Sequence, residues 1–250
     1  MMARRGVIGL LGGAAALLLT GCGIIKTYPS FRYRLTVEVE TPEGLKTGSS
    51  VIEVRWGAVD STLGGASAES RGEAAAVDLP GGRTLFALLS GESRSADWAD
   101  YAMFSVMPLP EKGPGQKDSD ALGIGIDRII ANKTLMVLPR MIAAPITAAQ
   151  ARVSAYPMLV RFGDIKDPKS VTLVDPDDLE KSFGPGVTLR RITVQITDDP
   201  VTTGIEKRLG WWRKFRDLHF DGTSNVSEDM TTTELAAHMS PGNFSTEYRK

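Results

Sequence analysis

The sequence predicts a β-rich α+β protein, with an antiparallel sheet or sandwich in the first half and a few short helices covering it. Apolar and polar residues alternate strictly along residues 31–40, which is typical of a strand with one buried and one solvated face. The alternation returns at residues 50–56, and segments rich in proline and glycine separate the apolar stretches. Short strands joined by turns favour antiparallel pairing.

Residues 31–107 are predicted to form this antiparallel β module. The buried face of its first strand carries every second residue, namely Phe31, Tyr33, Leu35, Val37 and Val39. Residues 72–79 and 83–89 form a predicted hairpin around Pro80-Gly81-Gly82, because proline followed by glycine fits a type II turn. Ser95 is then the predicted N-cap of a short helix in which Trp98 and Tyr101 recur at helical spacing.

A surface loop over residues 108–120 marks the predicted boundary between two halves of the chain. It contains three prolines and two glycines. A mixed α/β second half follows over residues 121–220, with predicted strands at residues 134–140 and 157–162.

No cofactor is predicted. Gly123 and Gly125 begin a glycine pattern, but Arg128 stands where a dinucleotide-binding loop needs its third glycine. Four acidic residues between Asp175 and Glu180 suggest a calcium loop, yet Leu179 and Glu180 occupy the positions of its third ligand and its glycine. We interpret these acids as the first turn of a helix capped by Asp175, where the helix dipole stabilises negative charge.

Residues 187–197 form a predicted strand with a fault in its alternation. The apolar residues are odd-numbered before Arg190-Arg191 and even-numbered after this pair. A slip of one residue predicts a β-bulge at the arginines. An anion-binding arginine pair is the alternative, but it explains the charge and not the periodicity.

Two adjacent tryptophans, Trp211 and Trp212, stand in the aromatic and basic stretch over residues 204–220. Such a composition is typical of a membrane interface or of a hot spot for a protein partner, so these two residues are the candidate partner contact. The alternative, which we favour, places both tryptophans in the core and the charges in solvent. Neighbouring side chains on a helix point about 100° apart, so we expect unequal burial. Residues 221–250 are predicted to be a polar, partly ordered tail.

The start of the chain has the composition of a secretory signal. Two arginines precede an uncharged apolar run over residues 6–19, and two small residues lead from it to Cys22, the only cysteine. An uncleaved membrane helix is the alternative, because residues 6–25 are uncharged and long enough to span a bilayer. The six glycines among them disfavour this alternative.

The order Leu19-Thr20-Gly21-Cys22 resembles the lipobox of bacterial lipoproteins. The sequences of residues 33–48 and 175–200 also resemble segments of uncharacterised lipoproteins of proteobacteria. The resemblance implies that residues 1–21 are a signal peptide, and that lipid is attached at Cys22. Residues 22–30 would then link the anchor to the first strand. It also implies that Gly23, in place of aspartate, favours sorting to the outer membrane, facing the periplasm, over retention in the inner membrane.

Charge and histidine content argue against several classes of function. After removal of residues 1–21, the chain keeps 27 of its 29 basic residues and all 30 acidic residues, so its net charge is −3. A nucleic-acid partner is therefore not predicted. The chain has two histidines, both near its C-terminus, which makes a histidine-based zinc site or a Cys–His pair difficult to build.

These observations predict a lipid-anchored envelope protein whose β-rich part is a non-enzymatic binding or structural module. Its predicted partners are the membrane, through the lipid on Cys22, and an envelope protein. The alternative is a periplasmic hydrolase tethered by the same lipid, because hydrolases with paired carboxylates need no sequence signature. An enzyme is expected to have a deep pocket with converging acids, and a binding module an exposed apolar patch.

Overall fold

The computed structural model describes residues 27–57, 67–93, 95–143, 152–224 and 234–248. Three helices lie in these ranges: α1 (Trp98–Tyr101), α2 (Asp118–Ala131) and α3 (Glu180–Phe183). The strands are β1 (Phe31–Glu40), β2 (Lys46–Trp56), β3 (Ala68–Arg71), β4 (Ala75–Leu79), β5 (Arg83–Gly91), β6 (Met136–Val137), β7 (Met141–Ala143), β8 (Arg152–Ser154), β9 (Pro157–Phe162), β10 (Val171–Leu173) and β11 (Thr188–Ile196). Short 3₁₀ turns connect many of them.

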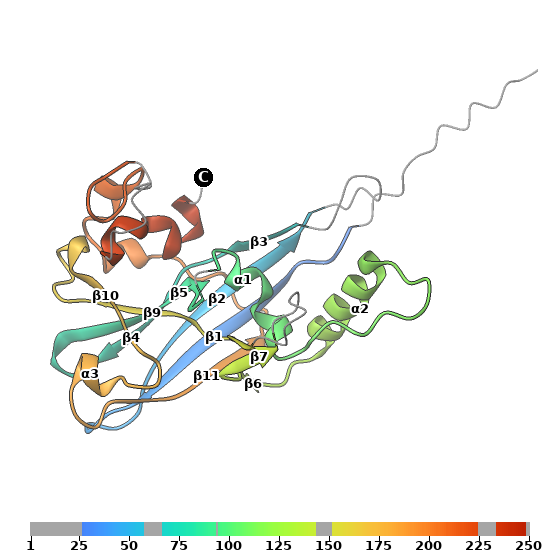
Figure 1. The fold of residues 1–250 in the computed structure, drawn as a ribbon, viewed down its shortest axis with the longest axis horizontal. Helices are drawn as coiled ribbons and strands as arrows, with labels where there is room; N and C mark the ends of the chain where they lie inside the picture. The colour runs from blue at the N-terminus through green and yellow to red at the C-terminus, as the bar shows by residue number, and fades with distance from the viewer. Residues whose placement is uncertain (1–26, 58–66, 94, 144–151, 225–233, 249–250) are drawn as a thin grey trace, which may run out of the picture.

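Two antiparallel sheets share one hydrophobic core (Figure 1). The five-stranded sheet has the order β3-β2-β1-β11-β6, and the four-stranded sheet has the order β10-β9-β5-β4. A two-stranded sheet, β7-β8, lies beside them. The core joins alternate residues of both large sheets, among them Leu35 and Val37 of β1, Leu85 and Leu89 of β5, and Ile192 and Val194 of β11. The predicted β-rich α+β class is thus confirmed.

Both halves of the chain contribute to both sheets. Strand β1 pairs with β11 in one sheet, and β5 pairs with β9 in the other. The loop that begins at residue 108 therefore does not separate two sheets. The sheet predicted for the first half is completed by strands of the second half.

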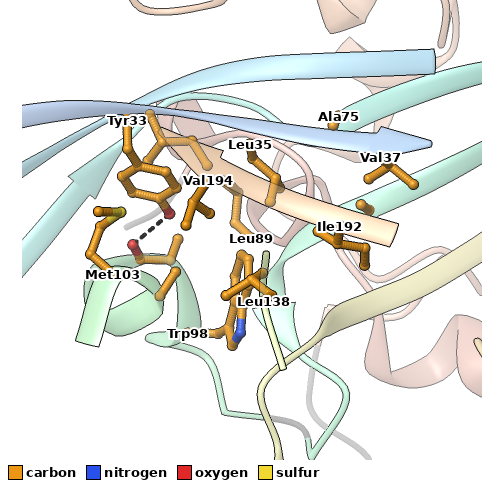
Figure 2. Packing of buried hydrophobic residues seen from close by; sticks show 14 of the residues in the cluster. Tyr33, Leu35, Val37, Ala75, Leu89, Trp98, Met103, Leu138, Ile192 and Val194 are labelled. Atoms are coloured by element: carbon orange, nitrogen blue, oxygen red, sulfur yellow. Dashed lines mark hydrogen bonds between the residues drawn. The ribbon is translucent and has the colours of Figure 1, made fainter. Parts of the chain in front are cut away.

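The predicted buried face of β1 lies at the centre of the core. Tyr33, Leu35, Val37 and Val39 have no exposed surface. Figure 2 shows the first three of them beside β11. The Tyr33 hydroxyl donates a hydrogen bond of 2.8 Å to the carbonyl oxygen of Ala99, the dashed line in Figure 2, which ties α1 to the sheet.

The predicted hairpin between β4 and β5 is confirmed. Leu79 pairs with Arg83, so the three residues between them form the turn. Gly81 and Gly82 both have positive φ, +76° and +70°. A type II turn needs only one such residue, so the turn differs from the predicted one, and both positions use the conformational freedom of glycine.

The predicted bulge in β11 is also confirmed. Glu38 pairs with Arg191 while Val39 pairs with Leu189, which leaves Arg190 as the extra residue. The two arginines bind carboxylates of β1: Arg191 lies 2.8 Å from Glu38 and Arg190 lies 3.0 Å from Glu40. These internal partners favour the bulge over an anion site.

The two predicted helices begin at other residues than predicted, and α2 was not predicted at all. Asp97, rather than Ser95, precedes α1, and its side chain makes no capping bond. Helix α2 begins inside the predicted loop, at Asp118, and its buried face repeats at helical spacing through Leu122, Ile126 and Ile129. Asp175 does not cap a helix.

Asp175 instead closes a turn ahead of α3. Its Oδ1 accepts a hydrogen bond of 2.9 Å from the backbone N–H of Asp177. Aspartate commonly bonds its own backbone two residues on, and this competes with helix initiation. Helix α3 therefore starts only at Glu180.

A second hydrophobic cluster covers the outer face of the four-stranded sheet. Phe86 and Leu88 of β5 and Phe162 of β9 point away from the shared core and meet the C-terminal segment, drawn in orange and red in Figure 1. The described part of the predicted tail joins this cluster through Phe244, which is fully buried, and through Met239. Spaced apolar side chains thus anchor a segment whose composition is largely polar.

Candidate functional site

The predicted lipid-attachment site, Cys22, and the predicted signal segment lie outside the described residues. The first residue that the structure describes is Thr27. Across the described ranges, no helix is long and apolar enough to cross a membrane.

The structure buries both tryptophans proposed as a partner contact. Trp211 is 8% exposed and Trp212 is 1% exposed. The Trp211 indole N–H donates a hydrogen bond of 2.8 Å to the Ile165 carbonyl oxygen, and its ring packs edge-on against Phe220. The Trp212 ring packs edge-on against Phe244.

The possible partner contact at Trp211 and Trp212 is therefore not exposed, and the favoured interpretation, that both lie in the core, is confirmed. The expectation of unequal burial assumed one helix with a single covered face. Trp211 instead precedes the 3₁₀ turn Trp212–Phe215, and it is covered by the segment around Ile165 while Trp212 lies beneath Phe244. Cover from two sides buries both rings.

An open cleft of about 640 Å³ lies beside β10. It is lined by β9 and β10, by the turn over residues 174–178, by α3, and by Glu92 and Arg140. Side chains of both signs surround it: Asp175, Asp177, Asp178, Arg140, Arg161 and Lys181.

Arg140 is the centre of the polar contacts in this cleft. Its Nη1 and Nη2 donate to the two carboxylate oxygens of Glu92 at 2.5 and 2.9 Å. Its Nε and Nη2 donate to Oδ2 of Asp177 at 3.0 and 2.9 Å. The hydroxyl of Ser154 accepts a further bond of 2.6 Å, and the guanidinium lies 5.2 Å from the centre of the Tyr156 ring. The planar fork of arginine suits such paired contacts.

These contacts fix the charges of the cleft. Hydrogen bonds from Arg140 hold the pKa of Asp177 below its ordinary value, and the bond to Asp177 contributes most to raising the pKa of Arg140. A carboxylate held ionised in this way is poorly matched to proton transfer near neutral pH. The arrangement suits recognition of a polar partner by fixed charges.

The acids noted between Asp175 and Glu180 are engaged within the fold. Asp177 binds Arg140, Asp178 accepts from the backbone N–H of Lys181, and Glu180 accepts from the backbone N–H of Gly186. In the described ranges, no group of three or more histidine, cysteine or acidic residues is placed to hold a metal ion.

Sequence reasoning missed Glu92 and Arg140. The partners of Arg140 lie 48 and 37 residues away along the chain, at Glu92 and Asp177. No local pattern marks such a residue, because the fold alone brings its partners together.

A second unusual group is Glu73, which lies between β3 and β4 and is 3% exposed. Its Oε2 accepts a hydrogen bond of 2.9 Å from the backbone N–H of Ile205. Its Oε1 is buried and has no hydrogen-bond partner among the described residues. The pKa of Glu73 is raised, chiefly by burial and further by the negative charges of Glu206 and Glu247, although the backbone N–H groups of Ile205 and Gly204 lower it in part.

Replacing Glu73 with glutamine is expected to flatten the dependence of stability on pH. The pKa of Glu73 in the folded protein is raised above its ordinary 4.5. The protonated carboxyl therefore contributes its whole stabilisation of the folded state below about pH 4.5. It is lost as the pH rises from about 4.5 through the folded pKa. Glutamine keeps an acceptor for Ile205 and does not titrate. Urea unfolding across this range, for both proteins, measures the difference.

The exposed Glu69 on β3 provides the matched control, since glutamine there should leave the pH profile of the wild type unchanged. Profiles for Glu73→Gln and wild type that run parallel would contradict the assigned role of burial.

Comparison with protein families, curated proteins and solved structures finds no match to this chain.

Proposed function

We propose that this chain is a lipid-anchored protein of the bacterial envelope, and that its β sandwich is a non-enzymatic binding module. The observation that carries the proposal is the order Leu19-Thr20-Gly21-Cys22 directly after the apolar run over residues 6–19. The ordered sandwich begins soon afterwards, with β1 at Phe31. Such spacing suits a domain held close to a membrane by its N-terminus.

The cleft around Arg140 supports binding over hydrolysis. A hydrolase with paired carboxylates needs one acid free to give up a proton and a second free to attack or to activate water. Here Glu92 and Asp177 converge, but both are bound by the same guanidinium. Leu173 of β10, 52% exposed, adds an apolar contact at the rim of this charged surface.

Replacing Cys22 with serine is expected to remove the lipid mass from the N-terminal fragment, because the thiol is the proposed site of lipid transfer. A serine variant that keeps residues 1–21 still has an apolar run that can hold a membrane, so the lipid mass, and not release from membranes, is the readout. Intact mass of the N-terminal fragment, from wild type and Cys22→Ser, measures the lipid directly. An unmodified wild-type chain that begins at Met1 or Met2 would overturn the anchor.

Binding through the cleft is tested in native membranes that hold the wild-type anchor, with a photo-crosslinking amino acid in place of Leu173. A discrete protein adduct is expected at this position. Leu45, 44% exposed and next to the turn between β1 and β2, is the matched control and should give none. Equal crosslinking at both positions, or none at either, would contradict the cleft as the contact surface.

A further inference from the structure

The end of the sandwich at which β1 begins carries a cluster of aromatic side chains. The rings of Tyr28 and Trp56 meet edge-on with centroids 6.5 Å apart. Trp56 in turn packs edge-on against Tyr101 at 5.8 Å and Phe104 at 6.0 Å. The cluster therefore joins the chain just before β1, the end of β2 and the helical segment after β5.

Helix α2 extends this cluster with apolar side chains. The Tyr28 hydroxyl donates a hydrogen bond of 2.9 Å to the Ser119 carbonyl oxygen in the first turn of α2. Figure 1 shows α2 beside the start of β1. A Cβ built on Gly125 would stand 2.5 Å from Cδ2 of Leu109 and 3.5 Å from a ring carbon of Phe104, so both side chains lie against α2. We call Tyr28, Trp56, Tyr101, Phe104 and Leu109 the aromatic end.

Part of the aromatic end faces solvent. Tyr101 is 41% exposed and Leu109 is 45% exposed, and Ile124 of α2, next to Gly125 in the chain, is 45% exposed. Tyrosine at such a surface suits the boundary between water and lipid, because its ring has an apolar body and a polar group. Trp56 and Tyr28 lie beneath this surface, at 8% and 9% exposed, and support the Tyr101 ring.

The distance from Cys22 places the aromatic end near a membrane. Six residue steps separate Cys22 from Tyr28, and at about 3.5 Å for each step they reach at most about 21 Å. A lipid on Cys22 therefore keeps Tyr28 within this distance of the headgroups. The opposite end of the sandwich, with Leu45, lies a further strand length away, about 33 Å for β1.

The charges around the aromatic end are of both signs, since Asp127 and Arg128 of α2 are both exposed. The Lys112 ammonium lies 2.5 Å from an oxygen of Asp118. Burial, with the negative charges of Asp97 and Asp100, raises the pKa of Tyr101. Charges of both signs therefore border the exposed Tyr101 ring, and the proposed contact with lipid rests on apolar burial.

We propose that the aromatic end docks onto the headgroup region of a zwitterionic phospholipid bilayer, so that the anchored sandwich stands with its Leu45 end away from the membrane. This inference rests on the proposed lipid anchor. It adds a second contact with the membrane and an orientation that a flexible tether alone would not impose.

The test uses the lipidated full-length mature protein, reconstituted in phosphatidylcholine liposomes. Cys22 is the only cysteine, and lipid occupies its thiol, so one introduced cysteine is a unique position for a fluorescent label. Leu109→Cys places an environment-sensitive label at the aromatic end. Leu45→Cys places it at the opposite end, and the two native side chains are almost equally exposed, at 45% and 44%.

The label at position 109 is expected to shift its emission to the blue and to lose fluorescence when the liposomes contain nitroxide-bearing lipid. The label at position 45 is expected to keep the emission of a water-exposed dye. Equal behaviour of the two labels, or quenching at 109 only when anionic lipid is added, would overturn the proposal.

The outcomes distinguish docking from anchoring. A lipidated protein that binds liposomes but leaves label 109 unquenched retains the anchor and refutes the docking. Two labels on each chain would show a free Cys22 thiol, which refutes the anchor and the docking that rests on it. Shielding of position 109 in native membranes but not in protein-free liposomes would assign the surface to a protein and overturn the lipid contact.

Discussion

Replacing Gly48 with alanine is expected to lower the free energy of unfolding by about 3 kcal/mol or more. A Cβ at this position in β2 would lie 2.0 Å from the carbonyl oxygen of Ala76 and 2.9 Å from the backbone nitrogen of Val77. Both are backbone atoms of β4, which cannot move aside as a flexible side chain can. The two strands belong to different sheets, so the added methyl group must push the sheets apart.

Gly210 provides the control, because a Cβ there would meet no atom within 4 Å. Gly210→Ala is expected to change the free energy of unfolding by at most about 0.5 kcal/mol. Urea unfolding of both variants measures the contrast. Similar values for the two would mean that β2 and β4 do not approach as closely as the structure shows.

Replacing Phe244 with alanine is expected to cost about 3–5 kcal/mol of stability, the usual range for removing a fully buried aromatic ring. Its ring meets Phe86 with centroids 5.5 Å apart and Phe220 at 5.7 Å. These partners come from β5 and from the segment after Trp212, so Phe244 joins the C-terminal segment to the sheet. Thermal unfolding, followed by tryptophan fluorescence, measures the loss.

Leu45→Ala provides the control for an exposed apolar side chain, with an expected change within about 0.5 kcal/mol. If Phe244→Ala unfolded at the temperature of the wild type, residues 234–248 would contribute little to the folded state. The second hydrophobic cluster would then depend on its members outside these residues, among them Trp211, Trp212 and Phe220.

The alternative functions of the chain differ in what the Arg140 cleft must do. A hydrolase would need its carboxylates released from Arg140, whereas a binding module uses them as they are held. Exposed apolar side chains lie at the aromatic end, at Tyr101, Leu109 and Ile124, and not at the tryptophans that composition suggested. Membrane contact and partner contact are therefore proposed for separate surfaces of the sandwich, and each has its own labelled position and control.

The sequence by itself determined the features that depend on neighbouring residues. The alternation along residues 31–40 predicted which side chains of β1 are buried, because successive strand residues point to opposite faces. The change of phase at Arg190-Arg191 predicted the bulge in β11 for the same reason. The proline and glycines before Arg83 predicted a hairpin. The proposed anchor at Cys22 also rests on local order.

Only the tertiary structure decided which distant segments meet. Pairing of β1 with β11 joins residues 148 to 163 apart, and the partners of Arg140 come from two separate turns. Trp211 and Trp212 are buried because the segment around Ile165 and the residue Phe244 cover them from different sides. Periodicity shows which face of a strand or helix is apolar and will be buried. It does not show which segment will cover that face, because this contact depends on the closure of long loops.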